Sequence, residues 1–228
     1  MPLSSTIEEN LQNLINQIKI IYSSPNLESH YLEYFKRQVT QIDERAPDNV
    51  KKVEKACFEL GIRNVSRFYK VESDYYEWEL QRRAFRLVAP SVEHLCKSVI
   101  FENTRFPHDE ISDPLNSKYY CVMVQYVGSI NTQKLMNYIR SLKNKSISKK
   151  NYNFRVADVE RMVQLTGFEH KGVSPIGMNQ SIPIILSKSI TELHPPVFYF
   201  GAGHKDWKLG MPILDFIKAT KCFVTDLL

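Results

Sequence analysis

The residue types most able to bind a ligand through the backbone gather in one tight loop. Gly172, Pro175 and Gly177 bracket Ser174, shortly after a predicted amphipathic helix that ends at Gly167. Glycine adopts positive φ and allows close approach of the backbone, while proline fixes φ and removes a donor. A loop built this way can aim its N–H groups at a ligand that bulkier side chains would exclude. The Ser174 hydroxyl could bond to such a ligand or cap its own loop, and no base is assigned that would make it a nucleophile.

A lysine stands at the start of an apolar run that is typical of a strand. Residues 96–102 read CKSVIFE, so the ammonium group of Lys97 would project from a sheet toward a cleft. The alternative is a lysine at a strand end that only keeps its amine in water.

Aromatic and basic side chains lie together in a third segment. The run Tyr75-Tyr76-Glu77-Trp78 is followed by Arg82, Arg83 and Arg86. Rings beside guanidinium groups suit stacking on single-stranded RNA ends. The alternative is an amphipathic helix that packs its rings and exposes its charges.

Histidines and cysteines are candidate metal ligands, but their spacing is wrong. His170, His194 and His204 fit no zinc pattern and fall in predicted loops or turns. The four cysteines are scattered without a CxxC pair, which is typical of reduced, mostly buried thiols in an intracellular protein. The sequence therefore predicts no metal site and no cofactor.

The charge and hydropathy of the chain set loose bounds on its partners. A net charge of +5 permits contact with nucleic acid without requiring it. Residues 143–150 read KNKSISKK, which is either a solvated loop or a clamp for an RNA backbone. No apolar run approaches the ~18 residues that span a bilayer, and the first residues lack a basic region. We therefore expect a cytoplasmic protein with no membrane or DNA partner.

The first 45 residues are predicted to form a helical hairpin. Apolar residues recur at spacings of three and four in its first helix, at Ile7, Leu11, Leu14, Ile18 and Tyr22. Ser24-Pro25 marks a break at which the second helix begins. The hairpin either covers the core of a main domain over residues 46–228 or docks a partner protein.

Strands and helices of uneven length alternate over residues 46–228. Strands are predicted near residues 65–71, 96–102, 119–126, 152–156, 183–186, 197–200 and 223–226. Helices are predicted near residues 48–60, 74–87, 131–142, 157–166 and 212–220. This mixture favours an α+β fold with a mixed β-sheet core and surrounding helices.

Four segments of the main domain resemble the YbaK-type aminoacyl-tRNA deacylases, the prolyl-tRNA synthetase-associated editing domain family. The segments are residues 97–101, 119–126, 156–177 and 197–226, and they match in order and spacing. The Thr166-Gly167 turn followed by GVSPIG is the most specific of the motifs. The N-terminal hairpin lies outside the resemblance.

The resemblance implies an enzyme that hydrolyses, in trans, the ester between a wrongly attached amino acid and the terminal adenosine of tRNA. An aminoacyl ester is already activated, so such a site can position water and stabilise the oxyanion without a metal or a Ser-His-Asp triad. The implied partners are the acceptor end of aminoacyl-tRNA and an aminoacyl-tRNA synthetase. The second hypothesis is a non-catalytic module of the same fold that binds tRNA or a protein.

The resemblance also implies roles for particular residues. Lys97 would hold the terminal nucleotide or the reacting ester, and the loop from Gly172 through Ser174 would bind the carbonyl through N–H groups. Substrate binding is expected of Tyr69, Pro175, Gly177, Gly201 and Gly203.

Two positions depart from the family pattern. Lys171 stands where the family usually has the first glycine of a Gly-x-x-x-Pro motif, so its side chain could narrow the pocket or restrict φ. Lys208 aligns with an acidic residue of several relatives, and Asp206 would share its face of a strand. These lysines motivate the non-catalytic hypothesis, whereas the retained Lys97 favours the catalytic one.

Overall fold

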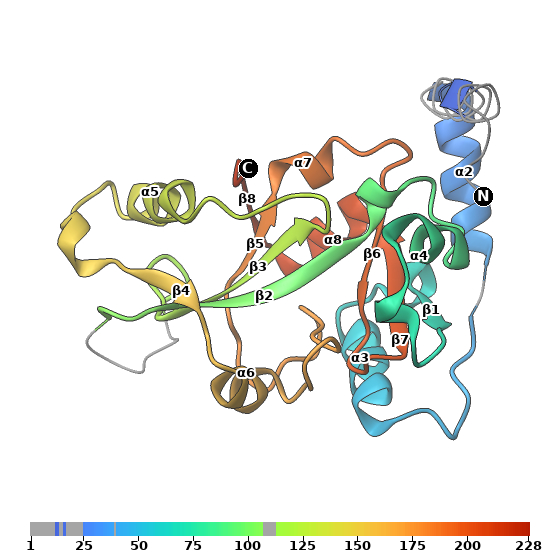
Figure 1. The fold of residues 1–228 in the computed structure, drawn as a ribbon, viewed down its shortest axis with the longest axis horizontal. Helices are drawn as coiled ribbons and strands as arrows, with labels where there is room; N and C mark the ends of the chain where they lie inside the picture. Colours follow the sequence, from blue (N-terminus) through green and yellow to red (C-terminus); the bar gives the residue numbers. More distant parts are fainter. Residues whose placement is uncertain (1–11, 14–15, 17–24, 39, 107–112) are drawn as a thin grey trace, which may run out of the picture.

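The computed structural model describes residues 12–13, 16, 25–38, 40–106 and 113–228 (Figure 1). Most of the first helix predicted for the N-terminal hairpin therefore lies outside the described residues. No helix in these ranges is both long enough and apolar enough to cross a membrane.

The elements of the described chain alternate between helix and strand. The α-helices are α2 (Pro25–Arg37), α3 (Asp48–Glu59), α4 (Leu80–Arg86), α5 (Thr132–Leu142), α6 (Val159–Thr166), α7 (Lys188–Thr191) and α8 (Ile213–Thr220). Single turns of 3₁₀ helix are η1 (Arg63–Val65), η2 (Tyr75–Glu77), η3 (Val92–His94) and η4 (Lys149–Asn151). The strands are β1 (Arg67–Lys70), β2 (Cys96–Asn103), β3 (Tyr119–Gln125), β4 (Phe154–Val156), β5 (Ile184–Ser187), β6 (Val197–Gly201), β7 (Trp207–Pro212) and β8 (Phe223–Thr225).

Within the described ranges these strands form two sheets. A five-stranded sheet has the order β4-β2-β3-β5-β8, antiparallel from β4 to β3 and parallel from β3 to β8. A three-stranded antiparallel sheet has the order β1-β7-β6. The predicted α+β fold with a mixed sheet and surrounding helices is confirmed.

Helices α5 and α6 lie on opposite sides of the five-stranded sheet (Figure 1). Alternate residues of β3 face opposite sides, so Tyr120 and Val122 pack in the cluster that holds Leu135 of α5. Cys121 points the other way and packs in the cluster that holds Met162 of α6. Both faces of β3 are therefore buried, which explains its unbroken apolar sequence.

The two sheets meet where β2 begins. Leu95, the residue before β2, forms an isolated parallel bridge with Tyr199 in β6. This bridge brings the start of β2 beside the three-stranded sheet, close to the end of β6. The junction lies beneath the loop that follows α6, and it positions the site described below.

Two predicted segments differ from the structure. Residues 207–212 are not among the predicted strands, yet they form β7, which pairs with strands on both sides. Residues 74–87 were expected to be one helix, but the chain breaks at Trp78, where ψ is 155°. The Trp78 indole N–H donates to the Asp74 carboxylate at 3.0 Å and holds this break. β7 depends on partners that are distant in sequence, whereas the break at Trp78 is held by a contact four residues away.

Helix α2 packs against the main domain. Phe35 is only 4 % exposed and lies in a cluster with Tyr199 and Val71. The buried Arg67 guanidinium donates to the Phe35 carbonyl at 2.8 Å. This packing supports the covering role for the second helix of the hairpin, while the division of the chain at residue 45 stays a prediction.

Candidate active site

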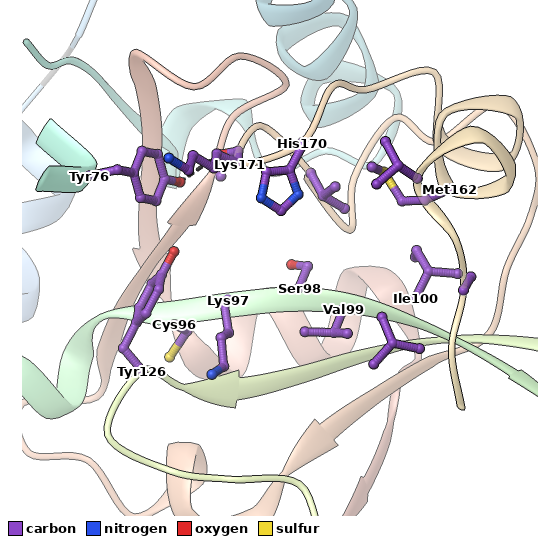
Figure 2. Close-up of a pocket in the computed structure, with 15 residues that line it drawn as sticks. Tyr76, Cys96, Lys97, Ser98, Val99, Ile100, Tyr126, Met162, His170 and Lys171 are labelled. Atoms are coloured by element: carbon purple, nitrogen blue, oxygen red, sulfur yellow. Dashed lines mark hydrogen bonds between the residues drawn. The ribbon is translucent and has the colours of Figure 1, made fainter. Parts of the chain in front are cut away.

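A pocket of about 400 Å³ opens between the start of β2 and the loop after α6 (Figure 2). One wall is aliphatic and consists of Val99, Ile100, Val156, Ala157, Val159 and Met162. The polar groups that converge on it come from Tyr76, Lys97, Ser98, Tyr126, His170 and Lys171. An apolar cavity with a few convergent polar groups is the usual form of a small-ligand site. Its described lining contains no aspartate or glutamate.

Lys97 is one of the residues that line this pocket, and its role there stays a prediction. Its amine is 5.7 Å from the centroid of the Tyr126 ring, which is within range for a cation–π contact. Its side chain leaves β2 on the side away from His170 (Figure 2). Within the described chain no hydrogen bond or ion pair holds this amine, so it can turn toward a ligand.

Ser98 is a site residue that the sequence analysis missed. Its hydroxyl is buried, and the Cys121 thiol, a weak hydrogen-bonding group, is the partner nearest to it; no stronger partner is present in the described part of the structure. The hydroxyl points toward His170 across the pocket (Figure 2). The buried Cys121 thiol lies near it, and burial raises the pKa of that thiol to about 12, so the thiol stays neutral. A buried polar group without a partner is costly, which suggests that a ligand or water completes its bonding.

Glycines allow the loop after α6 to touch the end of β6. The Gly172 carbonyl accepts a hydrogen bond from the Gly203 N–H at 2.9 Å. A Cβ atom on Gly201 would lie only 2.4 Å from the Val173 carbonyl oxygen, so this position has no room for a side chain. Gly201 also lines the pocket, whereas the Gly172 N–H donates to the Glu169 carbonyl at 2.9 Å. The N–H of Val173, a lining residue, has no acceptor in the described chain and is the better candidate for binding a carbonyl.

The later part of the loop faces away from this pocket. The buried Ser174 hydroxyl accepts a hydrogen bond from the Ile176 N–H at 3.1 Å, so it caps its own loop. Pro175 and Gly177 line a separate open groove, and a Cβ on Gly177 would contact Val53 of α3. The structure therefore does not place these three residues with Lys97.

Tyr69 also lies away from the pocket. Its ring centroid is 5.9 Å from that of Tyr199, in the cluster that includes Phe35. Burial raises the pKa of the Tyr69 phenol to about 12, which fits a packed, neutral side chain. The pocket is lined by Tyr76 and not by Tyr69.

Tyr76 is held by a group of cations. Its hydroxyl donates to the Lys171 carbonyl at 2.5 Å, and burial raises the pKa of the phenol. The Lys208 amine lies 4.4 Å from the ring centroid and donates to the Lys205 carbonyl at 2.7 Å. Burial lowers the pKa of Lys208 to about 7. Lys208 thus supports a wall residue of the pocket from behind and does not line the cavity.

The three arginines expected to bind RNA differ in the contacts that they make within the protein. Arg83 donates to the Trp78 carbonyl at 2.8 Å and also to the Tyr76 carbonyl. Arg86 forms an ion pair with Glu72 at 2.9 Å. Arg82 stacks on the Trp78 ring with 3.8 Å to the ring centroid. Their role in RNA binding stays a prediction.

The three histidines considered as metal ligands lie apart. His170 lines the pocket, whereas His194 contacts Glu28 at 2.8 Å and His204 accepts from the Asp206 N–H at 3.1 Å. Among the described residues, no three His, Cys, Asp or Glu side chains are grouped so that they could hold a metal ion.

Lys171 adopts the backbone conformation that glycine prefers. Its φ is 68°, in the left-handed region, at the position where the family usually has glycine. We expect Lys171→Gly to change the free energy of unfolding by less than about 1 kcal/mol, because relief of strain offsets the greater freedom of the unfolded chain. Lys171→Val should destabilise by about 2 kcal/mol, since a β-branched residue is rarely tolerated at positive φ. Urea unfolding of both variants measures the difference, and equal stabilities would contradict the assignment of strain.

The fold and the pocket together define an α+β domain with an apolar cavity beside the start of β2. Residues 83–219, more than half of the chain, match the aminoacyl-tRNA editing domain family. The chain belongs to this family.

Solved structures share the fold at low sequence identity. A candidate trans-editing enzyme for prolyl-tRNA synthetase superposes with a TM-score of 0.63 at 18 % identity, covering 80 % of this chain and 98 % of that one. A scaffold from work on epitope backbone grafting gives 0.62 at 16 % identity, covering 80 % of this chain and 97 % of that one. The hypothetical protein APE2540 gives 0.58 at 18 % identity, covering 77 % and 98 %. No curated protein matches the sequence significantly. Such likenesses establish the fold.

Proposed function

We propose that the protein hydrolyses the ester that joins a wrong amino acid to the terminal adenosine of tRNA, acting in trans on tRNA charged by a synthetase. The observation that carries the proposal is the shared pocket of Lys97, Ser98 and the loop after α6. The loop is about 75 positions after Lys97 and Ser98 in the sequence, yet all three contribute to the lining of one apolar cavity. Membership of the aminoacyl-tRNA editing domain family supports the same reaction class.

The chemistry needs a positioned water and a stabilised oxyanion. Water attacks the carbonyl carbon, the bond to the ribose oxygen breaks, and that oxygen takes up a proton. Two groups are suited to stabilise the oxyanion: the N–H of Val173, which has no acceptor in the described chain, and the ammonium of Lys97, which no described ion pair holds. The proposed mechanism routes no step through a metal ion.

Ser98 and His170 are suited to hold the attacking water. They face each other across the pocket, and among the described residues only the weakly bonding Cys121 thiol lies near the Ser98 hydroxyl. A neutral imidazole can accept a proton from water, and a serine hydroxyl can orient the water. The aliphatic wall formed by Ile100 and Met162 favours a small or apolar acyl side chain.

Hydrolysis of a panel of mischarged tRNAs tests this proposal. Alanyl- and cysteinyl-tRNA(Pro) are the first members, because a hydrolytic second sieve is needed where synthetase pockets discriminate poorly. We expect turnover above the spontaneous rate, and a loss of about 10²–10³-fold in Lys97→Ala, the usual effect of removing one group that stabilises an oxyanion.

A matched lysine substitution controls for the loss of charge. Lys55→Ala removes an exposed amine of α3, 79 % accessible, and should leave the rate unchanged. Equal rates for wild type and Lys97→Ala would show that the assigned site is wrong.

A second candidate function is a non-catalytic module that binds tRNA or a protein. It is favoured by the absence of a carboxylate from the described pocket lining and by Lys208, where several relatives carry an acid. If no member of the panel turns over while tRNA still binds, this candidate replaces the first.

A further inference from the structure

The edge of the five-stranded sheet carries positive charge that the proposed reaction does not use. β4 is the edge strand, and η4 precedes it directly. Arg105, Lys149, Lys150, Asn153 and Arg155 lie along this edge, and we call them the β4 strip. The strand continues into Val156, which lines the active-site pocket.

The lysines of the β4 strip are directed to solvent. Lys149 and Lys150 are exposed, and no carboxylate pairs with either of them in the described part of the chain. Arg155 keeps 63 % of its side chain exposed although it contacts Glu102 at 3.1 Å. Glu102 also lies 3.9 Å from Lys118, so one carboxylate serves two cations. Among the described residues of this edge, cations therefore outnumber carboxylates.

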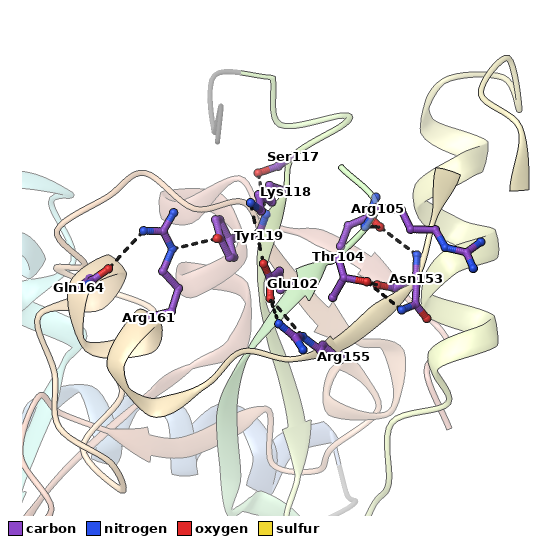
Figure 3. A network of polar contacts seen from close by, with 11 residues as sticks. Glu102, Thr104, Arg105, Ser117, Lys118, Tyr119, Asn153, Arg155, Arg161 and Gln164 are labelled. Carbon is purple, nitrogen blue, oxygen red and sulfur yellow. Dashed lines mark hydrogen bonds and ion pairs between the residues drawn. The ribbon is translucent and has the colours of Figure 1, made fainter. Parts of the chain in front are cut away.

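Hydrogen bonds fix the backbone of the β4 strip. The Arg105 guanidinium donates to the Lys150 carbonyl at 2.7 Å. The Asn153 amide donates to the Thr104 hydroxyl at 2.8 Å, and the Thr104 N–H donates to the Asn153 carbonyl at 2.9 Å (Figure 3). Hydrogen bonds thus join residues 104–105 to residues 150–153, and these two segments carry most donors of the strip.

The strip is also hollowed. A cavity of about 440 Å³ is lined by Arg105, Lys149, Lys150 and Asn153, with Tyr152 and Phe154 beneath them. Both rings are largely buried, so they form a floor under the charged groups. Such a concave, cationic surface complements the phosphates of a nucleic acid backbone.

The dimensions of the strip agree with this partner. The three residues of β4, Phe154–Val156, cover about 7 Å at ~3.3 Å per residue, and the η4 turn that holds Lys149 and Lys150 precedes them. One strand of a stacked duplex presents a phosphate about every 3.4 Å along its axis, so β4 alone faces on the order of two phosphates and the η4 lysines extend this surface. An RNA whose terminal nucleotide enters the pocket near Val156 would have its preceding nucleotides beside this edge.

We propose that the β4 strip binds the RNA backbone that leads into the active-site pocket, so that it anchors the acceptor end of tRNA. The proposal rests on the proposed function, because it takes the pocket as the place of the acylated nucleotide. It concerns a different element from the predicted RNA-binding residues Arg82, Arg83 and Arg86, which lie in α4. Contacts of this kind give affinity without reading sequence.

Salt-dependent binding of an uncharged tRNA transcript tests the proposal. Wild type is compared with the double variant Lys149→Ala/Lys150→Ala by fluorescence anisotropy between about 50 and 200 mM NaCl. The slope of log Kd against log salt should fall by about 1.5, since each lost phosphate contact contributes about 0.7–0.9. We expect affinity near physiological salt to fall roughly tenfold.

A second pair of lysines provides the matched control. Lys55→Ala/Lys188→Ala removes the same charge from α3 and α7, where the two amines lie near Glu59 and Glu192 at 3.8 and 3.4 Å. It should leave the slope unchanged. Equal slopes for the two double variants, or no change in either, would overturn the proposal.

Hydrolysis of a minimal ester separates this proposal from the proposed function. Aminoacyl-adenosine has no preceding nucleotides, so Lys149→Ala/Lys150→Ala should cleave it as fast as wild type. If wild type cleaves aminoacyl-adenosine but Lys149→Ala/Lys150→Ala binds tRNA as wild type does, the role of the β4 strip is rejected and the proposed function stands. Failure of wild type to cleave any ester would reject the proposed function, whatever the binding data show.

Discussion

The stability difference between wild type and Lys208→Met is expected to change by about 3 kcal/mol between pH 6.5 and pH 9.5. Lys208 is only 4 % exposed, and burial lowers the pKa of its amine from 10.5 to about 7. Below about pH 7 the amine is charged in both states, and the folded protein bears the full cost of burying it.

The sign of the pH dependence follows from proton binding. Between about pH 7 and 10.5 the unfolded chain holds a proton at Lys208 that the folded chain has released. Because the unfolded state binds more protons, the stability contributed by this residue rises with pH through that range. Methionine fills similar space against Tyr76 without a charge, so the variant lacks this rise.

Urea unfolding at several pH values measures the change. Subtracting the variant from wild type removes the titration of the other groups. Lys55→Met is the control for the loss of a lysine, since the Lys55 side chain is 79 % exposed, and the change with pH for Lys208→Met should clearly exceed that of the control. A pH-independent difference for Lys208→Met would mean that the buried amine is not the titrating group.

Much of the fold could be predicted because its strands carry local signals. Residues 96–102 and 119–126 have β-branched and aromatic runs, and they form β2 and β3 with nearly the predicted bounds. β7 gave no such signal, because Gly210 and Lys208 are poor strand residues. It is a strand because β1 and β6 flank it on both sides, which is a property of the assembled sheet.

The site could be predicted only in part. Lys97 and Gly201 line the pocket as expected, because the family motif placed them there. Ser98 and Tyr76 were missed as pocket residues, because nothing local distinguishes a lining residue from a packed one. The direction in which each side chain points depends on the junction between the sheets, and Leu95 forms that junction with a residue about a hundred positions later.

The structure gives a physical role to Lys171 and Lys208. In the sequence, their departure from the family pattern motivated the hypothesis of a non-catalytic module. In the folded chain both amines flank one ring, at 5.4 and 4.4 Å from the centroid of Tyr76. The two lysines that depart from the family pattern therefore contact the same residue, and both stabilise Tyr76, which lines the pocket. This arrangement is compatible with an intact site beside them.

Gly203→Ala is expected to destabilise the protein by about 3 kcal/mol, whereas Gly61→Ala should cost about 1 kcal/mol. Both glycines have positive φ, 91° at Gly203 and 71° at Gly61. A Cβ on Gly61 would meet nothing within 4 Å, so only backbone strain is added there. A Cβ on Gly203 would lie 2.5 Å from the Asn49 carbonyl oxygen of α3, so the helix or the turn must move.

The pair of variants also decides what Gly203 does. It was expected to bind substrate, yet its N–H donates to the Gly172 carbonyl at 2.9 Å and its Cα faces α3. If its role is to seat the loop, Gly203→Ala should lower both stability and turnover, because displacement of Gly172 carries Val173 away from the pocket. Urea unfolding and the deacylation assay measure the two effects. If Gly203→Ala instead loses turnover but is as stable as Gly61→Ala, Gly203 contacts the substrate as first predicted. A ligand contact can be lost without any strain between the turn and α3.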